Sequence, residues 1–191
     1  MRNVTLDEIV GLERYEKIRD EFRHRIIELK KHRRVSVGDR ITFVFENHDT
    51  VLFQIQEMLR TERITDIDKI RFEVDTYNEL MPGDSELSTT MLIEITEQAH
   101  VRPELVRLLG IDEAVSLQIG NRFTIPGVFE AGRSTEDNLS AVQYVRFPFS
   151  PEARAAFQDE HEDVRLVINH PNYQAQTQLS PEVRRSLAAE L

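Results

Sequence analysis

Acidic, amide and basic side chains that could form a ligand-binding site gather in one stretch, Phe43–Ile64. An apolar segment runs there through a polar junction into a helix with helical apolar spacing. Carboxylate and amide oxygens at such a junction can bind a cation or a small polar ligand, and an arginine can balance their charge. The candidate ligand-binding residues are Glu46, Asn47, Gln54, Glu57 and Arg60, with His170 at the end of a later strand.

Phe53 lies on the face of this helix opposite its apolar arc. The arc consists of Val51, Leu52, Ile55, Met58 and Leu59. Because a surface helix rarely carries phenylalanine on its outer face, we expect the helix to be covered on both sides, by its own domain or by a second subunit. Buried Glu57 would then need a partner, and Arg60 is the natural one at the i+3 position. Structural packing therefore competes with a polar pocket as the explanation of this pattern.

The histidines form no recognised metal signature. Two Glu-x-x-His pairs occur, but Glu21 and His24 lie opposite the apolar stripe of their helix, which predicts a position in solvent. The second pair, at 97 and 100, precedes a proline and lacks the long helix that a di-metal bundle site requires. We therefore predict no metal site. Neither a glycine-rich phosphate loop nor a Gly-x-Ser-x-Gly motif is present, so no catalytic residue is assigned.

Two further histidines each have a structural and a functional interpretation. His48, between Glu46 and Asp49, is either a solvated turn residue or a group that binds a cation or transfers protons. His170 precedes Pro171, which favours an extended backbone, and it is either a turn residue or part of a pocket wall.

The composition restricts the function classes. The 191 residues include no cysteine, which excludes disulfides and thiol catalysis. A net charge of −10 argues against general nucleic-acid binding. Residues 13–34 nevertheless carry nine Lys/Arg against five Asp/Glu, which fits a helix C-terminus or the docking of an acidic partner. With no apolar run of about 18 residues and no signal-peptide core, we expect a cytoplasmic protein without a membrane span.

The apolar patterns predict an α+β fold in one domain, residues 1–191, with 1–83 mainly helical and 84–191 mainly β. Long helices are expected at 6–34, after an N-cap at Asp49, and from about 66 to 80. The helical region should pack on an antiparallel or mixed sheet, because crossover helices between the strands are missing. Strands are expected at 40–46, 88–95, 115–119, 122–130, 141–149 and 164–169, and short helices at 103–109, after Ser150-Pro151 and after Ser180-Pro181.

Four segments carry a family resemblance: residues 45–58 (FENHDTVLFQIQEM), 77–82 (YNELMP), 86–88 (ELS) and 166–171 (LVINHP). They resemble the bacterial domain-of-unknown-function family 3501, and the resemblance covers nearly the whole chain. It implies no known activity and supplies no catalytic residues. The resemblance implies Arg at position 48 in many relatives, where this chain has His, which weakens a catalytic role for His48. Members are often encoded beside rubrerythrin-like and iron–sulfur oxidoreductase proteins, which implies, by association, a role near oxidative-stress or electron-transfer chemistry.

These observations favour a non-catalytic accessory protein that binds a protein partner, or itself as a homodimer, in a redox-related system. The alternative is a metal- or small-ligand-dependent enzyme or sensor with a carboxylate-rich site near residues 46–60. A third interpretation is a nucleotide- or RNA-binding module that uses the basic end of the first helix. The sequence identifies no cofactor, and it leaves open whether Glu46, Glu57 and His170 share a cavity.

Overall fold

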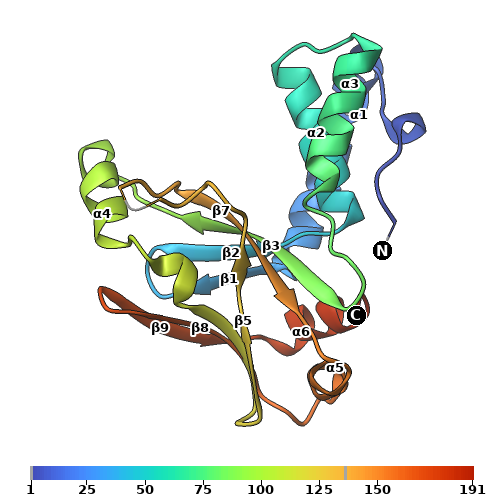
Figure 1. Cartoon of the computed structure of the whole chain (residues 1–191). Helices are drawn as coiled ribbons and strands as arrows, with labels where there is room; N and C mark the ends of the chain where they lie inside the picture. The colour runs from blue at the N-terminus through green and yellow to red at the C-terminus, as the bar shows by residue number, and fades with distance from the viewer. Residues whose placement is uncertain (1, 136) are drawn as a thin grey trace.

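Two antiparallel sheets form the β part of the molecule, and three long helices stand beside them (Figure 1). The computed structural model describes residues 2–135 and 137–191. The first sheet has the order β1-β2-β3-β7-β6, with β1 (Arg34–Val37), β2 (Ile41–Phe45), β3 (Glu86–Ile93), β7 (Val142–Pro148) and β6 (Val128–Phe129). The second has the order β5-β4-β8-β9, with β5 (Phe123–Pro126), β4 (Val115–Ile119), β8 (Val164–His170) and β9 (Tyr173–Gln178). The predicted α+β class is confirmed, and the described strand pairs are antiparallel.

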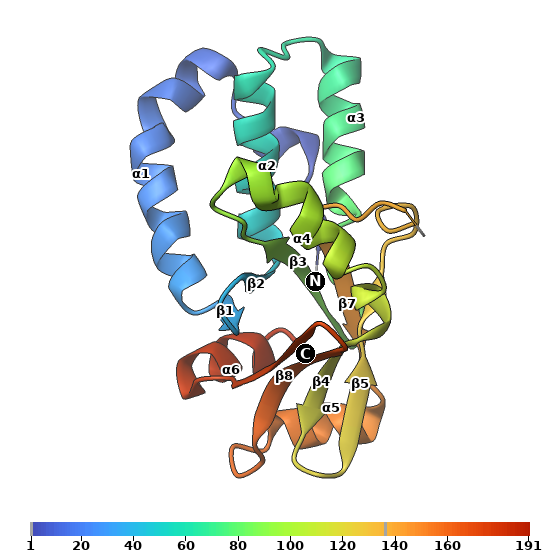
Figure 2. The same cartoon turned by 90° about the vertical axis from the view of Figure 1, so that its left-hand side faces the viewer.

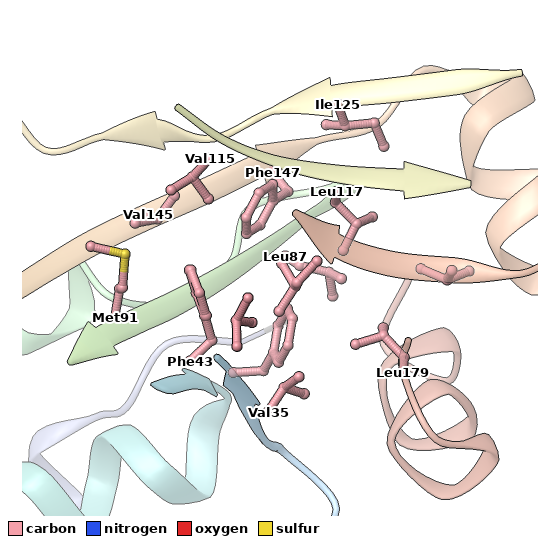
Figure 3. Packing of buried hydrophobic residues seen from close by; sticks show 14 of the residues in the cluster. Val35, Phe43, Leu87, Met91, Val115, Leu117, Ile125, Val145, Phe147 and Leu179 are labelled. Carbon is pink, nitrogen blue, oxygen red and sulfur yellow. The ribbon is translucent and has the colours of Figure 1, made fainter. Parts of the chain in front are cut away.

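The main hydrophobic core lies between the two sheets. Side chains of the first sheet, such as Phe43 and Phe147, meet Leu117 of the second (Figure 3). Strand β4 shows the alternation that this packing requires, because every second residue is buried. Strand β2 differs, since all five of its residues are buried. Both faces of β2 are therefore covered, and the second face is the one that lies next to the helices.

The three long helices are α1 (Leu12–Lys31), α2 (His48–Thr61) and α3 (Ile67–Asn78), and they stand together at one end of the first sheet (Figures 1 and 2). Helix α2 packs on α3 through Ile55 and Val74, which belong to one apolar cluster. Its other side packs on α1, where the rings of Phe22 and Phe53 meet edge to face, with centroids 5.6 Å apart. The prediction that this helix is covered on both sides is confirmed, and the cover comes from the same chain.

The shorter helices are α4 (Val101–Arg107), α5 (Pro151–Gln158) and α6 (Pro181–Ala188). Ser150 and Ser180 cap α5 and α6 as predicted, because each side chain accepts a hydrogen bond from a backbone N–H of the first turn. Single 3₁₀ turns occur at Leu6–Glu8, Gln98–His100 and Ile111–Glu113. No helix within the described ranges, 2–135 and 137–191, has the length and apolar character needed to cross a bilayer.

The predicted helix at 6–34 is wrong at both ends. Thr5 and Glu8 do interact, since the Glu8 carboxylate accepts a hydrogen bond from the Thr5 backbone N–H, but they hold only a 3₁₀ turn. Helix α1 starts after Gly11 and ends at Lys31, and the following residues pair with β2 as strand β1. Gly38 lies in the β1–β2 turn with φ +73°, and a Cβ there would lie 2.3 Å from the Tyr173 hydroxyl.

Two further predictions are corrected. Asn47, not Asp49, caps α2, because the Asn47 side chain accepts a hydrogen bond of 3.1 Å from the Thr50 N–H. The segment 173–178, which carried no strand prediction, forms the edge strand β9. The predicted strand at 122–130 divides at Gly127, where β5 leaves the second sheet and β6 joins the first.

Arg33 connects three parts of the fold. Its side chain is 1% exposed although it carries a charge. The guanidinium donates to the carbonyl oxygens of Phe45 (2.8 Å) and Glu46 (3.1 Å), where β2 runs into α2. It also makes two parallel hydrogen bonds, of 2.7 and 2.6 Å, to the carboxylate of Glu190, just beyond α6. One side chain therefore joins the end of α1, the β2–α2 junction and the C-terminal segment.

Glu190→Ala should reduce the free energy of unfolding by about 3–5 kcal/mol, because it leaves the buried Arg33 charge without its carboxylate. Urea unfolding of purified protein measures the loss. Glu28→Ala is the matched control, since Glu28 forms an exposed i,i+3 pair with Lys31 and should cost about 1 kcal/mol or less. Equal losses for the two variants would contradict the central role of Arg33.

Candidate functional site

Glu46 follows β2 directly and is a buried carboxylate, 3% exposed. It accepts hydrogen bonds from the hydroxyls of Thr50 (2.5 Å) and Thr90 (2.6 Å) and from the side-chain amide of Gln54 (2.9 Å). Among the described ion pairs, none includes this carboxylate. Its burial is therefore compensated by three neutral donors and not by a cation.

Local structure explains how these donors meet. The Glu46 N–H continues the sheet ladder to the carbonyl of Ser88 at 2.8 Å, so its side chain emerges on the face of the first sheet that carries Thr90. The chain then turns into α2, and the spacing of four residues brings Thr50 and Gln54 over the same carboxylate. The site thus joins a strand, the neighbouring strand and the first two turns of a helix.

A cavity of about 310 Å³ lies beside this cluster, between the end of α3 and strands β6 and β7. Strand register explains part of its lining, because Ser88 pairs with Arg146, and Thr90 pairs with Tyr144. Tyr144 lines the cavity, and its strand neighbour Thr90 donates a hydrogen bond to Glu46, so the cavity adjoins the Glu46 cluster. We call it the junction cavity, and its walls are Glu79, Leu80, Ser88, Val128, Phe129, Glu130, Tyr144 and Arg146.

The junction cavity has a hydroxyl group in its wall. Ser88 is 3% exposed, and none of the described hydrogen bonds uses its hydroxyl; the Ser88 oxygen is not one of the fully buried atoms that lack a partner, so it is open to the cavity. The Tyr144 hydroxyl is likewise unpaired within the described residues. Burial raises the pKa of Tyr144; the Arg133 charge opposes this increase, and the charges of Glu130 and Glu46 add to it. The phenol is therefore held neutral and can act as hydrogen-bond donor and acceptor.

The structure brings some predicted site residues together and separates others. Glu46, Asn47 and Gln54 meet at the foot of α2, where the Asn47 amide also donates to Glu190 at 3.0 Å. Glu57 faces α1 and not the cavity. His170 lies elsewhere, with Nε2 bonded to the Leu109 carbonyl at 2.9 Å. None of the described cavities is lined by Glu46, Glu57 or His170.

The predicted partner of Glu57 is wrong. Arg19 of α1 makes two hydrogen bonds of 2.8 Å to Glu57, and the Tyr15 hydroxyl donates a third of 2.8 Å. Arg60 pairs with Glu16 of α1 at 2.8 Å. These contacts join α1 to the C-terminal half of α2, where Glu57 and Arg60 serve helix packing.

No histidine lines the junction cavity in the part of the chain that the structure describes. Glu21 and His24 are exposed on α1, as predicted, and His100 pairs with Glu97 at the surface at 3.1 Å. His48 lies between Glu8, 3.1 Å away, and Asp49, 3.4 Å away, so it joins the N-terminal segment to α2.

The acid stability of the protein should depend on Glu57. The hydrogen bonds from Arg19 lower the pKa of Glu57 against the effect of its partial burial, and Tyr15 adds to the decrease. A carboxyl with a lowered folded-state pKa stabilises the fold above its ordinary pKa of about 4.3, and this contribution is lost as the pH falls through the folded-state pKa.

Glu57→Gln should therefore cost about 1–3 kcal/mol at pH 7. The difference from the unmodified protein should shrink as the pH falls below about 4. Urea unfolding across this pH range measures it, with Glu28→Gln on the exposed face of α1 as the control. A cost that does not change with pH would contradict the assigned role.

The comparisons with known proteins agree with the fold. A crystal structure of a novel protein of unknown function from Burkholderia pseudomallei K96243 is similar over 100% of both chains, with a TM-score of 0.93 and 33% sequence identity. No curated protein matches the sequence. Residues 3–191 match the family model described as "Protein of unknown function (DUF3501)". The chain belongs to the DUF3501 family.

Proposed function

We propose that the protein is an accessory binding protein that receives a group of a protein partner in the junction cavity. The observation that carries this proposal is the junction cavity itself, onto which the Ser88 hydroxyl opens with no described hydrogen bond. A ligand in the cavity can form a hydrogen bond with this hydroxyl, and a hydrogen bond of this kind contributes about 0.5–1.5 kcal/mol.

The size of the cavity limits what it can receive. Its volume of about 310 Å³ lies at the lower end of the range for small-molecule sites, about 300–1,000 Å³. One side chain or a small polar group fits this space, and a dinucleotide or haem would need more. A protruding side chain of another protein matches both the volume and the mixture of polar and apolar walls.

The family association decides which partners to test first. Rubrerythrin-like and iron–sulfur oxidoreductase proteins are the first candidates, and a second copy of the chain is the other. The support for a redox-related role is this association alone. The support for binding is the cavity and its unpaired hydroxyls.

Ser88→Leu tests the proposal, because leucine takes up part of the cavity and removes the hydroxyl. We expect the unmodified protein to bind a purified partner from these classes, and Ser88→Leu to weaken the affinity at least tenfold by calorimetry. Thr124→Leu is the control, since it adds similar bulk at an exposed position of β5 in the other sheet. The proposal is wrong if folded Ser88→Leu binds as tightly as the control.

A metal- or ligand-dependent enzyme or sensor near residues 46–60 is the second candidate. The buried carboxylate of Glu46 favours it, but both oxygens already accept hydrogen bonds, so a metal would have to displace Thr50, Thr90 or Gln54. Elemental analysis of protein purified from native cells separates the two candidates. Stoichiometric iron, manganese or zinc that is lost in Glu46→Gln would support the second candidate.

A further inference from the structure

We infer that the junction cavity binds the guanidinium group of a partner's arginine side chain, and that Arg133 of this chain competes for two of its lining residues, Tyr144 and Glu130, until the partner arrives. The inference rests on the proposed function and names the chemistry of the group that the same site receives. It follows from where Arg133 lies, from the charges around the cavity and from the unpaired hydroxyls.

Arg133 shows that two residues of the cavity lining already bind a guanidinium. Its Cζ lies 4.0 Å from the centroid of the Tyr144 ring, and its side chain forms an ion pair with Glu130. Both contacts involve residues that line the cavity. An aromatic face with a carboxylate beside it is a characteristic recognition site for arginine, because the planar cation can stack and form hydrogen bonds at once.

The charges around the cavity also favour a cation. Glu79 and Glu130 line it, and Glu46 lies behind Thr90. Arg146 is the cation of the lining, but it is already engaged by the Glu86 carboxylate and by the backbone carbonyl of Glu79. An anionic ligand would meet the carboxylates of Glu79 and Glu130, whereas a guanidinium could take the place of Arg133 beside Glu130.

The unpaired hydroxyls match the hydrogen-bonding capacity of a guanidinium. This group carries five N–H donors and no acceptor, so it needs several acceptors at once. The oxygens of Ser88 and Tyr144 have free acceptor capacity within the described residues, and the Glu130 carboxylate adds a charged one. Arg133 reaches the ring and Glu130 but makes no hydrogen bond to Ser88, so a partner's arginine that enters the cavity gains a contact that Arg133 does not make.

Arg133 can leave without a change in the fold. Its backbone carbonyl is fixed by hydrogen bonds from the Ser140 N–H (3.0 Å) and from the Gln143 side chain (3.3 Å). Its side chain is 34% exposed, and both of its contacts are of the kind that contributes little at a surface. A rotation of this side chain into solvent would therefore free the Tyr144 ring and Glu130 for the incoming arginine.

Two blocked amino acids test the inference on the full chain by calorimetry. N-acetyl-arginine methylamide carries the guanidinium, and N-acetyl-citrulline methylamide has nearly the same shape without the charge. We expect the arginine probe to bind more tightly than the citrulline probe. Arg133→Ala should increase the affinity for the arginine probe about tenfold, because it removes the internal competitor. Arg165→Ala, which removes a surface arginine paired with Asp163 on the other sheet, should leave it unchanged.

Further variants identify the contacts. In the Arg133→Ala background, Tyr144→Leu should weaken binding of the arginine probe about tenfold. Glu130→Gln, which keeps the shape of the side chain, gives a second test if Tyr144→Leu does not fold. Equal binding of both probes, or no gain from Arg133→Ala, would overturn the inference. Tighter binding of N-acetyl-lysine methylamide than of the arginine probe would also overturn it.

These outcomes are distinct from failure of the proposed function. If Ser88→Leu abolishes binding of the protein partner but the arginine probe does not bind, the cavity remains the partner's site and the arginine assignment is wrong. If Ser88→Leu has no effect on the partner, the proposed function itself is wrong.

Discussion

The architecture depends on the buried guanidinium of Arg33. Its backbone N–H is still bonded to the Lys30 carbonyl of α1 at 3.1 Å, so it cannot donate to Phe45 across the β1–β2 pair. The side chain supplies the missing donor, since its Nε bonds to the Phe45 carbonyl. A helix and a strand can thus follow each other within three residues, and no buried carbonyl is left without a donor at the join.

The same junction fixes the candidate site. Arg33 holds the backbone carbonyl of Glu46, while Thr50 and Thr90 hold its carboxylate from the other side. Glu46 is therefore held through its backbone and through its side chain, and these contacts fix the direction in which α2 leaves the sheet. Helix α3 packs on α2, so the position of α2 also determines where α3 ends. Glu79 and Leu80, directly after α3, form one side of the junction cavity. A lysine at position 33 would lack the planar set of donors that reaches two carbonyls and a carboxylate together.

Sequence patterns predicted those parts of the fold that depend on local spacing. The strands with alternating apolar residues, the Ser-Pro helix starts and the two-sided burial of α2 are of this kind. The basic run before it concealed strand β1. Strand β9 was missed because Tyr173 and Ala175, which pack on the core, alternate with glutamines and make only a weak apolar pattern. Glu46 and Gln54 could be predicted as neighbours because helical spacing joins them. Thr90, 44 residues from Glu46, and Arg19, 38 residues from Glu57, are neighbours only through strand register and helix packing.

The two faces of β3 explain why a polar cavity forms on this side of the sheet. Leu87 and Met91 point into the core, whereas Ser88 and Thr90 point toward the helices and are nevertheless buried. Apolar residues would be the more stable choice on a doubly covered strand, because a buried hydroxyl needs a partner. Thr90 has one in Glu46, but Ser88 has none among the described residues. The hydroxyl of Ser88 opens instead onto the junction cavity, which therefore lies on the face of the sheet opposite the core.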